Sequence, residues 1–483
     1  MNTRETDLLF RNILLFDGSG AEPLPGDLAV VGDRITAVGP GLAVGGREVV
    51  DGDGMALAPG FIDIHTHDDA VVLHPDGMVA KLTQGVTTVV TGNCGISLAP
   101  GLPPGMDLPT PPLDLLGLAE AFSYDGFGDY LAALRAFGPA VNVLPLVGHT
   151  LLRLRAMGDC DRPATPEEIG RMRAELADAL TAGAIGLSTG LAYPPARYAS
   201  TEEVFHLVTE VARAGALWTT HMRDERAGVV SAVAETLDIA RRSGARTLIS
   251  HHKCCGAAAF GLSRTTLEMI AAARRELPLD LDVYPYTASS TVLNQAFARD
   301  SKTVTISWSD PHPACAGRTL TDVAAEWGME EDAALERLKP GGAIYHQMCE
   351  QDLRRIMAFP ATLVGSDGLP RGHRPHPRLW GTFPRVLGHY ARDEGIFGME
   401  TAVAKMSGQT AAALKLTDRG YLRAGYKADL VVFDPACIAD VATYDDPIRP
   451  ACGISSVYVN GSLAVREGVP TGVRAGSVIS VSA

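Results

Sequence analysis

The sequence predicts an α/β fold: a TIM-type (β/α)8 barrel with a small β-sandwich built from both chain ends. Between residues 58 and 420, short apolar segments alternate with helical stretches, which is the pattern of parallel strands joined by helices. Residues 1–57 and 421–483 instead hold closely spaced β-type segments punctuated by Gly, Pro and Asp. We therefore predict a barrel domain at 58–420 and a sandwich domain that is discontinuous in sequence.

The composition narrows the class of protein. A chain of 483 residues, 46% of them hydrophobic, can bury a large core and hold more than one domain. Its net charge of −14 argues against nonspecific binding to nucleic acid or to an anionic membrane, although a cleft can still be locally positive. The eight cysteines follow no framework spacing, and the chain shows neither a secretory leader at Met1–Phe10 nor a membrane-spanning apolar run. We expect a cytoplasmic protein with reduced thiols.

The two chain ends contain the segments expected to form the sandwich. In these segments, apolar and β-branched residues cluster between turn residues. The expected strands are Leu8–Phe10, Ile13–Leu15, Leu28–Val31 and Ile35–Val38 near the start, and Ala428–Phe433, Ile454–Val459 and Val478–Val481 near the end.

The central region holds eight candidate strands, each a short and mostly apolar run. In order they are Gly60–Ile64, Val86–Thr91, Val141–Val147, Ala184–Leu187, Leu217–Thr220, Arg246–Ser250, Leu279–Val283 and Ala361–Val364. Helical patterns lie between most of them, at Pro166–Ala182, Thr201–Ala214, Val229–Arg242 and Leu267–Glu276. Eight such units predict a barrel whose chemistry sits at the carboxyl ends of the strands.

One connection is too long for a βα unit. Residues 285–360, between the seventh and eighth strands, contain Pro311-His312-Pro313 and a helical pattern over Leu320–Leu338. We interpret this segment as an inserted lid subdomain that closes over the site.

Residues with metal-binding side chains follow the expected strands directly. His65 and His67 follow the first strand, and because side chains alternate along a strand, both are expected to point to the same side. The others stand after the second, fifth, sixth and eighth strands: Cys94, His221, His251 and Asp367. In a barrel these strand ends converge on one mouth, so the pattern predicts the divalent-metal site of a hydrolase.

Each of these residues has a simpler explanation when it is taken alone. A His-x-His pair is more often on a surface or in a turn, a Cys in a Gly-Asn turn is usually a small buried hydrophobe, and Asp367 in Ser-Asp-Gly fits a turn. Alternation lets only one of His251 and His252 face the barrel axis, so the other is expected to pack elsewhere. The coincidence of all of them at strand ends favours the metal site.

This arrangement resembles the amidohydrolase superfamily, which carries a His-x-His pair after the first strand, histidines after strands five and six, and an aspartate after strand eight. Most two-metal members also carry a carboxylated lysine at the end of strand four, whereas this chain has Gly186–Gly190 there and Cys94 after strand two. That departure is similar to the D-aminoacylase (N-acyl-D-amino-acid deacylase) family. The motifs that carry this narrower resemblance are Gly92–Gly95, Gly186–Pro195, His221–Glu225, Ser250–Lys253, Asp282–Tyr286 and Gly365–Gly368, while Ala424–Val431 resembles the return of the superfamily chain into its β-sandwich.

The resemblance implies a zinc enzyme. Cys94, His221 and His251 would hold a tightly bound zinc ion, which leaves one position open for catalysis. His65 and His67 would form a second, weaker metal position that Cys94 is able to bridge.

The resemblance also implies roles for other polar residues. Asp367 would take a proton from the attacking water and pass it to the leaving amine. Arg378 is the best candidate to bind the α-carboxylate of the substrate, because a guanidinium fork fits a carboxylate, although its position alone suits a solvated loop cation equally well. Four further residues would line the pocket: Tyr284 and Ser290 as carboxylate contacts, with Tyr193 and Lys253 beside them.

The implied reaction is zinc-dependent hydrolysis of N-acyl-D-amino acids to a carboxylate and a free D-amino acid. The lid stretch Val292–Arg299 is neutral apart from Arg299, which favours neutral or hydrophobic side chains, with selectivity for D-glutamate or D-aspartate as the alternative. A cyclic-amide hydrolase of the dihydropyrimidinase or dihydroorotase type, and a silent ligand-binding barrel, are further alternatives. We expect a small-molecule substrate and neither a nucleic acid nor a membrane as partner. The oligomeric state stays open, and a monomer is compatible with the sequence.

Overall fold

The computed structural model describes residues 6–106 and 108–480, and it confirms the predicted barrel. Its parallel strands are almost entirely buried. They are β6 (Phe61–Asp63), β7 (Val86–Thr91), β8 (Asn142–Pro145) with its continuation β9 (Val147–Gly148), β10 (Gly186–Gly190), β11 (Leu217–His221), β12 (Arg246–Ile249), β13 (Leu279–Val283) and β17 (Thr362–Val364). The strand predicted at Ala184–Leu187 is displaced along the chain, because β10 begins at Gly186 and pairs with β11 as far as Gly190.

The barrel closes between its first and last strands. Parallel pairing runs β6-β7-β8 on one side and β9-β10-β11-β12-β13-β17 on the other, and the main chain carries β8 directly into β9. At the remaining seam, Thr66 and Gly368 form a parallel bridge, and the main-chain N–H of Asp367 donates to the carbonyl of His65 at 2.7 Å. The first and last strands are therefore joined at their carboxyl ends, where predicted site residues stand.

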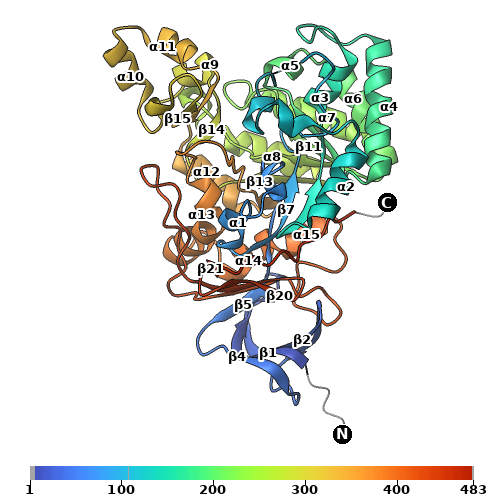
Figure 1. Ribbon diagram of the computed structural model, residues 1–483, viewed down its shortest axis with the longest axis vertical. Helices are drawn as coiled ribbons and strands as arrows, with labels where there is room; N and C mark the ends of the chain where they lie inside the picture. Colours follow the sequence, from blue (N-terminus) through green and yellow to red (C-terminus); the bar gives the residue numbers. More distant parts are fainter. Residues whose placement is uncertain (1–5, 107, 481–483) are drawn as a thin grey trace.

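Helices cover the outside of the barrel (Figure 1). Among them are α2 (Phe127–Phe137), α3 (His149–Ala156), α4 (Pro166–Ala182), α6 (Thr201–Arg213), α7 (Val229–Ser243), α8 (Ser263–Ala273), α12 (Glu350–Ala358) and α14 (Met399–Met406). In α4, Thr165 and Glu168 form a capping box and Gly183 follows the last turn, so both of its ends are marked in the sequence. Within residues 6–106 and 108–480, none of the helices combines the length and the apolar character needed to cross a bilayer.

Both chain ends contribute to one nine-stranded sheet, which lies at the opposite end of the molecule from the helices α9 (Gln295–Arg299), α10 (Leu320–Trp327) and α11 (Glu331–Arg337) (Figure 1). Its order is β21-β20-β19-β18-β5-β1-β2-β3, with β4 paired to β1. The strands are β1 (Thr6–Leu15), β2 (Leu24–Val31), β3 (Arg34–Gly39), β4 (Gly46–Asp51), β5 (Ala56–Pro59), β18 (Leu430–Phe433), β19 (Ile454–Val459), β20 (Ser462–Arg466) and β21 (Val469–Pro470). The division of the chain into domains at residues 57 and 420 stays a prediction.

The sheet's core draws on both ends of the chain. Phe10, Leu430 and Tyr458 belong to one buried cluster, although they come from the first and last parts of the sequence. The sequence predicts a strand of the sheet at Val478–Val481. For residues 478–480, which the structure describes, this prediction is wrong. Val478 forms only an isolated bridge with Val143 of the barrel, because the chain here passes along β8 instead of joining the sheet, and Val481 lies outside the described residues.

The long connection between β13 and β17 contains a separate small unit (Figure 1). Its antiparallel sheet has the order β14-β16-β15. The unit contains β14 (Ser289–Val292), β15 (Val304–Ser309), β16 (Gly341–Tyr345), α9 (Gln295–Arg299), α10 (Leu320–Trp327) and α11 (Glu331–Arg337). The single helix predicted over Leu320–Leu338 is wrong, because Gly328 adopts a left-handed conformation (φ 62°) that ends α10. Closure of this unit over the site stays a prediction.

A buried polar cluster joins the barrel to the nine-stranded sheet. Asp429, next to β18, accepts hydrogen bonds from Nδ2 of Asn142 on β8 (3.1 Å) and from the main-chain N–H of Asn460 (2.7 Å). Asp429 also pairs with Arg419, and both side chains are buried. Removing one member of a buried ion pair leaves the other charge without compensation, which is strongly destabilising.

We therefore expect Asp429→Ala to destabilise the protein by roughly 3–5 kcal/mol, because Arg419 would remain buried without its counter-charge. Asp429→Asn should cost less, since an amide oxygen can still accept hydrogen bonds. Thermal unfolding should give Tm values in the order wild type, Asp429→Asn, Asp429→Ala. Asp238→Ala removes an exposed partner of Arg242 and serves as the control. Equal Tm values for Asp429→Ala and Asp238→Ala would contradict the expectation.

Candidate active site

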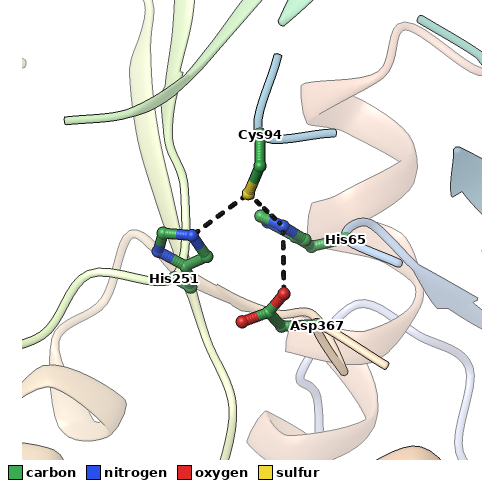
Figure 2. Close-up of side chains that lie close together, drawn as sticks. All are labelled: His65, Cys94, His251 and Asp367. Atoms are coloured by element: carbon green, nitrogen blue, oxygen red, sulfur yellow. Dashed lines mark hydrogen bonds and ion pairs between the residues drawn. The ribbon is translucent and has the colours of Figure 1, made fainter. Parts of the chain in front are cut away.

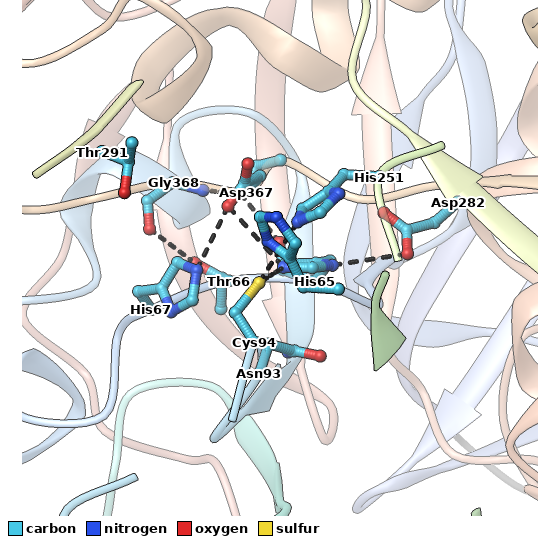
Figure 3. A network of polar contacts seen from close by, with 12 residues as sticks. His65, Thr66, His67, Asn93, Cys94, His251, Asp282, Thr291, Asp367 and Gly368 are labelled. Atoms are coloured by element: carbon cyan, nitrogen blue, oxygen red, sulfur yellow. Dashed lines mark hydrogen bonds and ion pairs between the residues drawn. The ribbon is translucent and has the colours of Figure 1, made fainter. Parts of the chain in front are cut away.

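The predicted metal-binding residues meet at the mouth of the barrel. Each of them follows a barrel strand or ends one, and all are buried. They are His65 and His67 after β6, Cys94 after β7, His221 at the end of β11, His251 after β12 and Asp367 after β17. Figure 3 shows the side chains of His65, His67, Cys94, His251 and Asp367 converging from these strands. The strand-end arrangement expected from the sequence is thus present in three dimensions, while the roles of the residues stay predictions.

Cys94 lies at the centre of this cluster. Its Sγ is 3.2 Å from Nε2 of His65 and 3.2 Å from Nε2 of His251 (Figure 2). His65 Nε2 lies 3.6 Å from Oδ1 of Asp367, and His67 Nε2 approaches the same oxygen at 3.1 Å. One sulfur, several imidazole nitrogens and one carboxylate oxygen therefore face a common point.

Three of these residues have an unusual backbone conformation. Cys94, His251 and Asp367 have φ angles of 53°, 36° and 49°, in the left-handed region. Such a conformation costs a residue other than glycine of order 1–3 kcal/mol, and it persists where the surrounding structure enforces it. His252 faces away from the cluster, with Nε2 2.9 Å from Oγ1 of Thr266 on α8. Only one of the two adjacent histidines faces the site, as side-chain alternation predicts.

The donor set fits a zinc ion. One ligand atom from each of His65, Cys94, His251 and Asp367 lies within 4.8 Å of the others. Two ligands of a tetrahedral zinc ion lie roughly 3.3–3.8 Å apart, so small side-chain adjustments would complete such a site. His221 belongs to a second group of this kind that shares His251, and its ring packs edge to face on that of His251, with centroids 4.4 Å apart. Nδ1 of His221 is buried and has no hydrogen-bond partner among the described residues.

The electrostatics of the cluster also favour a cation. Burial raises the pKa of the Cys94 thiol, but the neighbouring imidazoles of His65 and His251 hold that pKa well below its ordinary value. Burial lowers the pKa of His67, yet its contacts with Asp367 and Cys94 raise this pKa to about 9. Protons on the imidazoles thus balance a thiolate and a carboxylate. A divalent cation bound between these groups would replace such protons.

Two buried carboxylates behind the histidines were not among the predicted site residues. Asp282 Oδ1 lies 3.3 Å from Nδ1 of His65, and Glu225 Oε1 lies 3.0 Å from Nδ1 of His251. Carboxylates in this position fix the tautomer and the orientation of a metal-binding imidazole. Both stand inside motifs that carried the family resemblance, Asp-Val-Tyr-Pro-Tyr and His-Met-Arg-Asp-Glu. The motifs give no sign of which imidazole each carboxylate faces.

Arg378 lies beside the cluster and is fully buried at the start of α13 (Arg378–Arg385). Its Nη1 is 2.9 Å from Oδ2 of Asp367, and its Nη2 donates to the carbonyl of Ser290 at 3.0 Å. The guanidinium also lies over the ring of Tyr284, 4.5 Å from the centroid. The alternative that Arg378 is a solvated loop cation is therefore wrong. Its side chain is buried against Ser290 and Tyr284, the two residues that are also expected to contact the substrate carboxylate.

Tyr193 and Lys253 contact protein groups close to the histidines. Tyr193 Oη lies 2.9 Å from Oγ1 of Thr291 on β14, which connects the barrel mouth to the inserted unit. Lys253 Nζ donates to Glu225 Oε1 at 2.8 Å and lies 2.7 Å from Nδ1 of His251. Lys253 therefore sits behind the metal-binding cluster as well as beside the cavity.

A cavity that opens to solvent lies next to the cluster. Of the predicted residues, it is lined by His67, Cys94, Tyr193, His221, His251, Lys253, Ser290 and Asp367. Apolar side chains on its wall are Ile96, Leu115, Phe297 and Leu369. Arg299 is exposed and pairs with Asp332 of the inserted unit, so it does not reach this space.

Comparison with known proteins agrees with this geometry. The profile of the amidohydrolase family matches residues 48–465. A D-aminoacylase of Alcaligenes xylosoxydans xylosoxydans is 50% identical over 99% of this chain and 98% of its own length. A crystal structure of D-aminoacylase superposes with a TM-score of 0.95 at 49% identity, covering 99% of this chain and 100% of that one. The chain belongs to the D-aminoacylase family of amidohydrolases.

Other members of the D-aminoacylase family are almost as similar. An N-acyl-D-aspartate deacylase of the same organism is 48% identical over 99% of this chain and 95% of its own length. The N-acyl-D-glutamate deacylase of Bordetella bronchiseptica, solved with zinc and a phosphonate inhibitor, superposes with a TM-score of 0.94 at 43% identity over 99% of this chain and 100% of that one. Overall similarity therefore identifies the family and leaves the preferred side chain of the substrate to be argued from the cavity.

We expect Cys94→Ala to lose tightly bound zinc, because a soft thiolate at the centre of the cluster suits this ion. After dialysis against a chelator, metal analysis should find stoichiometric zinc in the wild type and almost none in the variant. Cys255→Ala is the matched control, since Cys255 is a second buried cysteine on the cavity wall, and it should keep its zinc. Stoichiometric zinc in Cys94→Ala would remove Cys94 from the ligand set.

Proposed function

We propose that this protein hydrolyses the amide bond of N-acyl-D-amino acids in a zinc-dependent reaction. The observation that carries the proposal is the place of Asp367 on the cavity wall, where its Oδ1 faces His65 and His67 and its Oδ2 pairs with the buried Arg378. A metal-binding cluster, a carboxylate able to move a proton and a buried guanidinium are the groups that hydrolysis of such a substrate requires. The names of the similar family members support the D-amino acid part of the proposal.

We assign the tight zinc site to Cys94, His221 and His251, and a weaker second site to His65 and His67 with Cys94 able to bridge. A zinc ion held by these residues supplies Lewis acidity toward an amide carbonyl and a water molecule. Three nitrogen or sulfur ligands leave a position free for the reactants, as catalytic zinc sites do.

Asp367 is proposed to move the proton. Burial raises the pKa of Asp367, but Arg378 and the imidazoles of His67 and His251 hold it well below the ordinary value, so the carboxylate is ionised. An ionised carboxylate can accept a proton from the attacking water and deliver it to the leaving nitrogen. General acid–base catalysis of this kind contributes roughly 10²–10⁴-fold to the rate.

Arg378 is proposed to bind the α-carboxylate of the substrate, with Tyr284 and Ser290 beside it. The guanidinium has five N–H donors, so it can contact a substrate carboxylate and Asp367 together. Its Nε is buried and makes no hydrogen bond among the described residues, and because neither Arg378 nor Tyr284 lines the cavity, a substrate carboxylate would reach them only if the cavity wall opened. A substrate fixed by its carboxylate and by its scissile carbonyl can place its side chain in one direction only, and this is the basis of the expected stereoselectivity.

We propose that the preferred side chain is neutral or hydrophobic. Each cation on the cavity wall already has an acidic partner: Arg223 with Glu235, Arg226 with Asp300 and Lys253 with Glu225. An acidic side chain would have to share one of these cations with its present carboxylate, whereas Phe297 and Leu115 offer apolar contacts. Selectivity for D-glutamate or D-aspartate remains the alternative, with Arg226 or Lys253 as the cation that would bind the side chain.

A cyclic-amide hydrolase is a weaker alternative. Two-metal enzymes of that type are expected to use a lysine at the end of the fourth strand. Here β10 (Gly186–Gly190) carries none, and Cys94 occupies the centre of the cluster instead.

The state of the cysteines indicates the redox conditions of the compartment in which the protein is expected to act. All eight are free thiols in the structure. We therefore propose a reducing compartment, the cytoplasm, as its location.

The function is tested by comparing hydrolysis of N-acetyl-D- and N-acetyl-L-amino acids by the zinc-loaded protein. We expect kcat/KM for N-acetyl-D-leucine to exceed that for the L-enantiomer by at least roughly a hundredfold, because a single misfitting methylene is already discriminated by about 10–200-fold and the L-enantiomer misplaces its whole side chain. N-acetyl-D-glutamate and dihydrouracil test the alternatives, and removal of zinc should abolish the activity. Preference for the L-enantiomer or for the cyclic amide would contradict the proposal.

We expect Arg378→Ala to raise KM and also to lower kcat, since the guanidinium contacts Asp367 as well as the substrate site. Loss of a buried charge-assisted contact costs about 2–5 kcal/mol, which corresponds to a fall in kcat/KM of roughly 30- to 4,000-fold. Arg378→Lys should recover part of the activity because it keeps the charge but not the fork. Zinc content should not change.

Arg385→Ala is the matched control for this experiment, since Arg385 is a second arginine of α13 and pairs with Asp440 away from the cluster. It should keep most of the activity. Normal hydrolysis of N-acetyl-D-amino acids by Arg378→Ala would show that the carboxylate binds elsewhere.

A further inference from the structure

Lys81 is a buried cation that the proposed reaction does not use. It lies on the one-turn helix α1 (Val79–Leu82), and its side chain is 1% exposed. Its Nζ donates to Oδ2 of Asp63 at 2.8 Å and to Oγ of Ser366 at 2.6 Å, and it lies 3.4 Å from Oδ2 of Asp68. Burial of an ammonium group is costly unless the group is paired and hydrogen-bonded, so this arrangement calls for an explanation.

Asp63 and Ser366 connect this cation to the backbone on both sides of the barrel seam. Asp63 Oδ1 accepts hydrogen bonds from the main-chain N–H groups of His65 (3.2 Å) and Ser366 (2.8 Å). Ser366 Oγ accepts from the N–H of Gly368 at 3.0 Å. Ser366 and Gly368 flank Asp367, whose backbone is in the left-handed region. The hydrogen bonds around Lys81 therefore hold the strained turn that presents Asp367.

Gly368 leaves no space between this turn and the lysine. A Cβ atom at position 368 would lie 2.9 Å from Nζ of Lys81 and 3.0 Å from Oγ of Ser366. The carbonyl of Gly368 accepts from the N–H of His67 at 3.0 Å, and Figure 3 shows Gly368 beside Thr66 and His67. A displacement of Lys81 would therefore move the turn at Asp367 and, through Gly368, the segment that carries His67.

The same short segment also holds the helix that carries Arg378. Gln84, just after α1, donates from Nε2 to the carbonyl of Leu379 at 2.8 Å and accepts at Oε1 from the N–H of Phe383 at 3.3 Å. Leu379 and Phe383 lie on α13, which begins at Arg378. Residues 81–84 thus contact Ser366, which precedes Asp367, and the helix α13, which begins at Arg378.

We propose that Lys81 is a positioning residue for Asp367. Through Asp63 and Ser366 it sets where the Asp367 carboxylate lies relative to the metal-binding histidines and to Arg378. This inference rests on the proposed role of Asp367 in moving the proton. Since the hydrogen bonds of Lys81 go to Asp63 and Ser366 and not to Arg378, its loss should lower kcat much more than it changes KM.

Lys81→Met tests this role because methionine keeps most of the length of the unbranched side chain and removes its charge and hydrogen bonds. We expect kcat to fall by roughly 10–100-fold, a large part of what an acid–base group contributes. KM and zinc content should stay close to the wild-type values. Lys81→Arg, which keeps a cation and its donors, should restore part of kcat.

Ser366→Ala removes a single hydroxyl and decides the matter if Lys81→Met does not fold. It should show the same loss in kcat, and Ser366→Thr should restore activity because it keeps the hydroxyl. The matched control is Lys405→Met, at a second buried lysine whose Nζ bonds the carbonyls of Phe359 and Thr362 at the other end of β17. This control should lower Tm and leave kcat unchanged.

A crystal structure of Lys81→Met, or of Ser366→Ala, gives a readout that does not depend on activity. The distance from Asp367 Oδ1 to His67 Nε2, 3.1 Å here, should lengthen in the variant. The inference is overturned if a folded variant keeps both this distance and a kcat within about threefold of the wild type, or if KM and zinc content change as much as kcat. Absence of wild-type activity on N-acyl-D-amino acids would instead contradict the proposed function, and the distance would still decide the role of Lys81.

Discussion

Closure of the barrel between β6 and β17 is the constraint on which the candidate site depends. Hydrogen bonds from Asp367 N–H to the carbonyl of His65 (2.7 Å) and from His67 N–H to the carbonyl of Gly368 (3.0 Å) join the two strand ends. In an open sheet these residues would stand on opposite edges. Because the sheet closes into a ring, the first strand's histidines and the last strand's carboxylate share one hydrogen-bonded seam. Cys94 then joins the cluster from β7, which pairs with β6, and His251 joins it from β12, which lies two strands from β17.

Burial of so many charges imposes a second condition, which the site meets by pairing them. Asp282 stands behind His65, Glu225 behind His251, and Arg378 beside Asp367. An unpaired ion in these places would be costly, so each functional group needs its partner for stability as well as for orientation. The same pairing explains how a carboxylate can stay ionised in a buried position, since Arg378 and the imidazoles counteract the effect of burial on the pKa of Asp367.

The sequence is informative where structure is local and uninformative where it depends on distant contacts. Apolar runs located the eight barrel strands, and the position of each ligand-type residue after its strand located the cluster. The break at Gly328 has a local signal, a glycine at a helix end, that a continuous helical pattern concealed. No local sequence signal predicts which carboxylates contact His65 and His251. The same holds for the contact of Lys81 with Ser366, because only closure of the barrel decides which side chains face each other.

Cys94, His251 and Asp367 have left-handed backbone conformations, which the proposed chemistry would require of side-chain-bearing residues at these positions. Glycine would adopt these conformations without strain, but it offers no side chain to bind a metal or to move a proton. Each turn costs of order 1–3 kcal/mol, a noticeable part of the roughly 5–15 kcal/mol by which proteins are stable. Strained turns persist only where surrounding contacts enforce them. The buried hydrogen bonds among Lys81, Asp63 and the turn at Asp367 are such contacts, and on this reasoning the residues behind the turn would matter to the proposed catalysis as much as those that face the cavity.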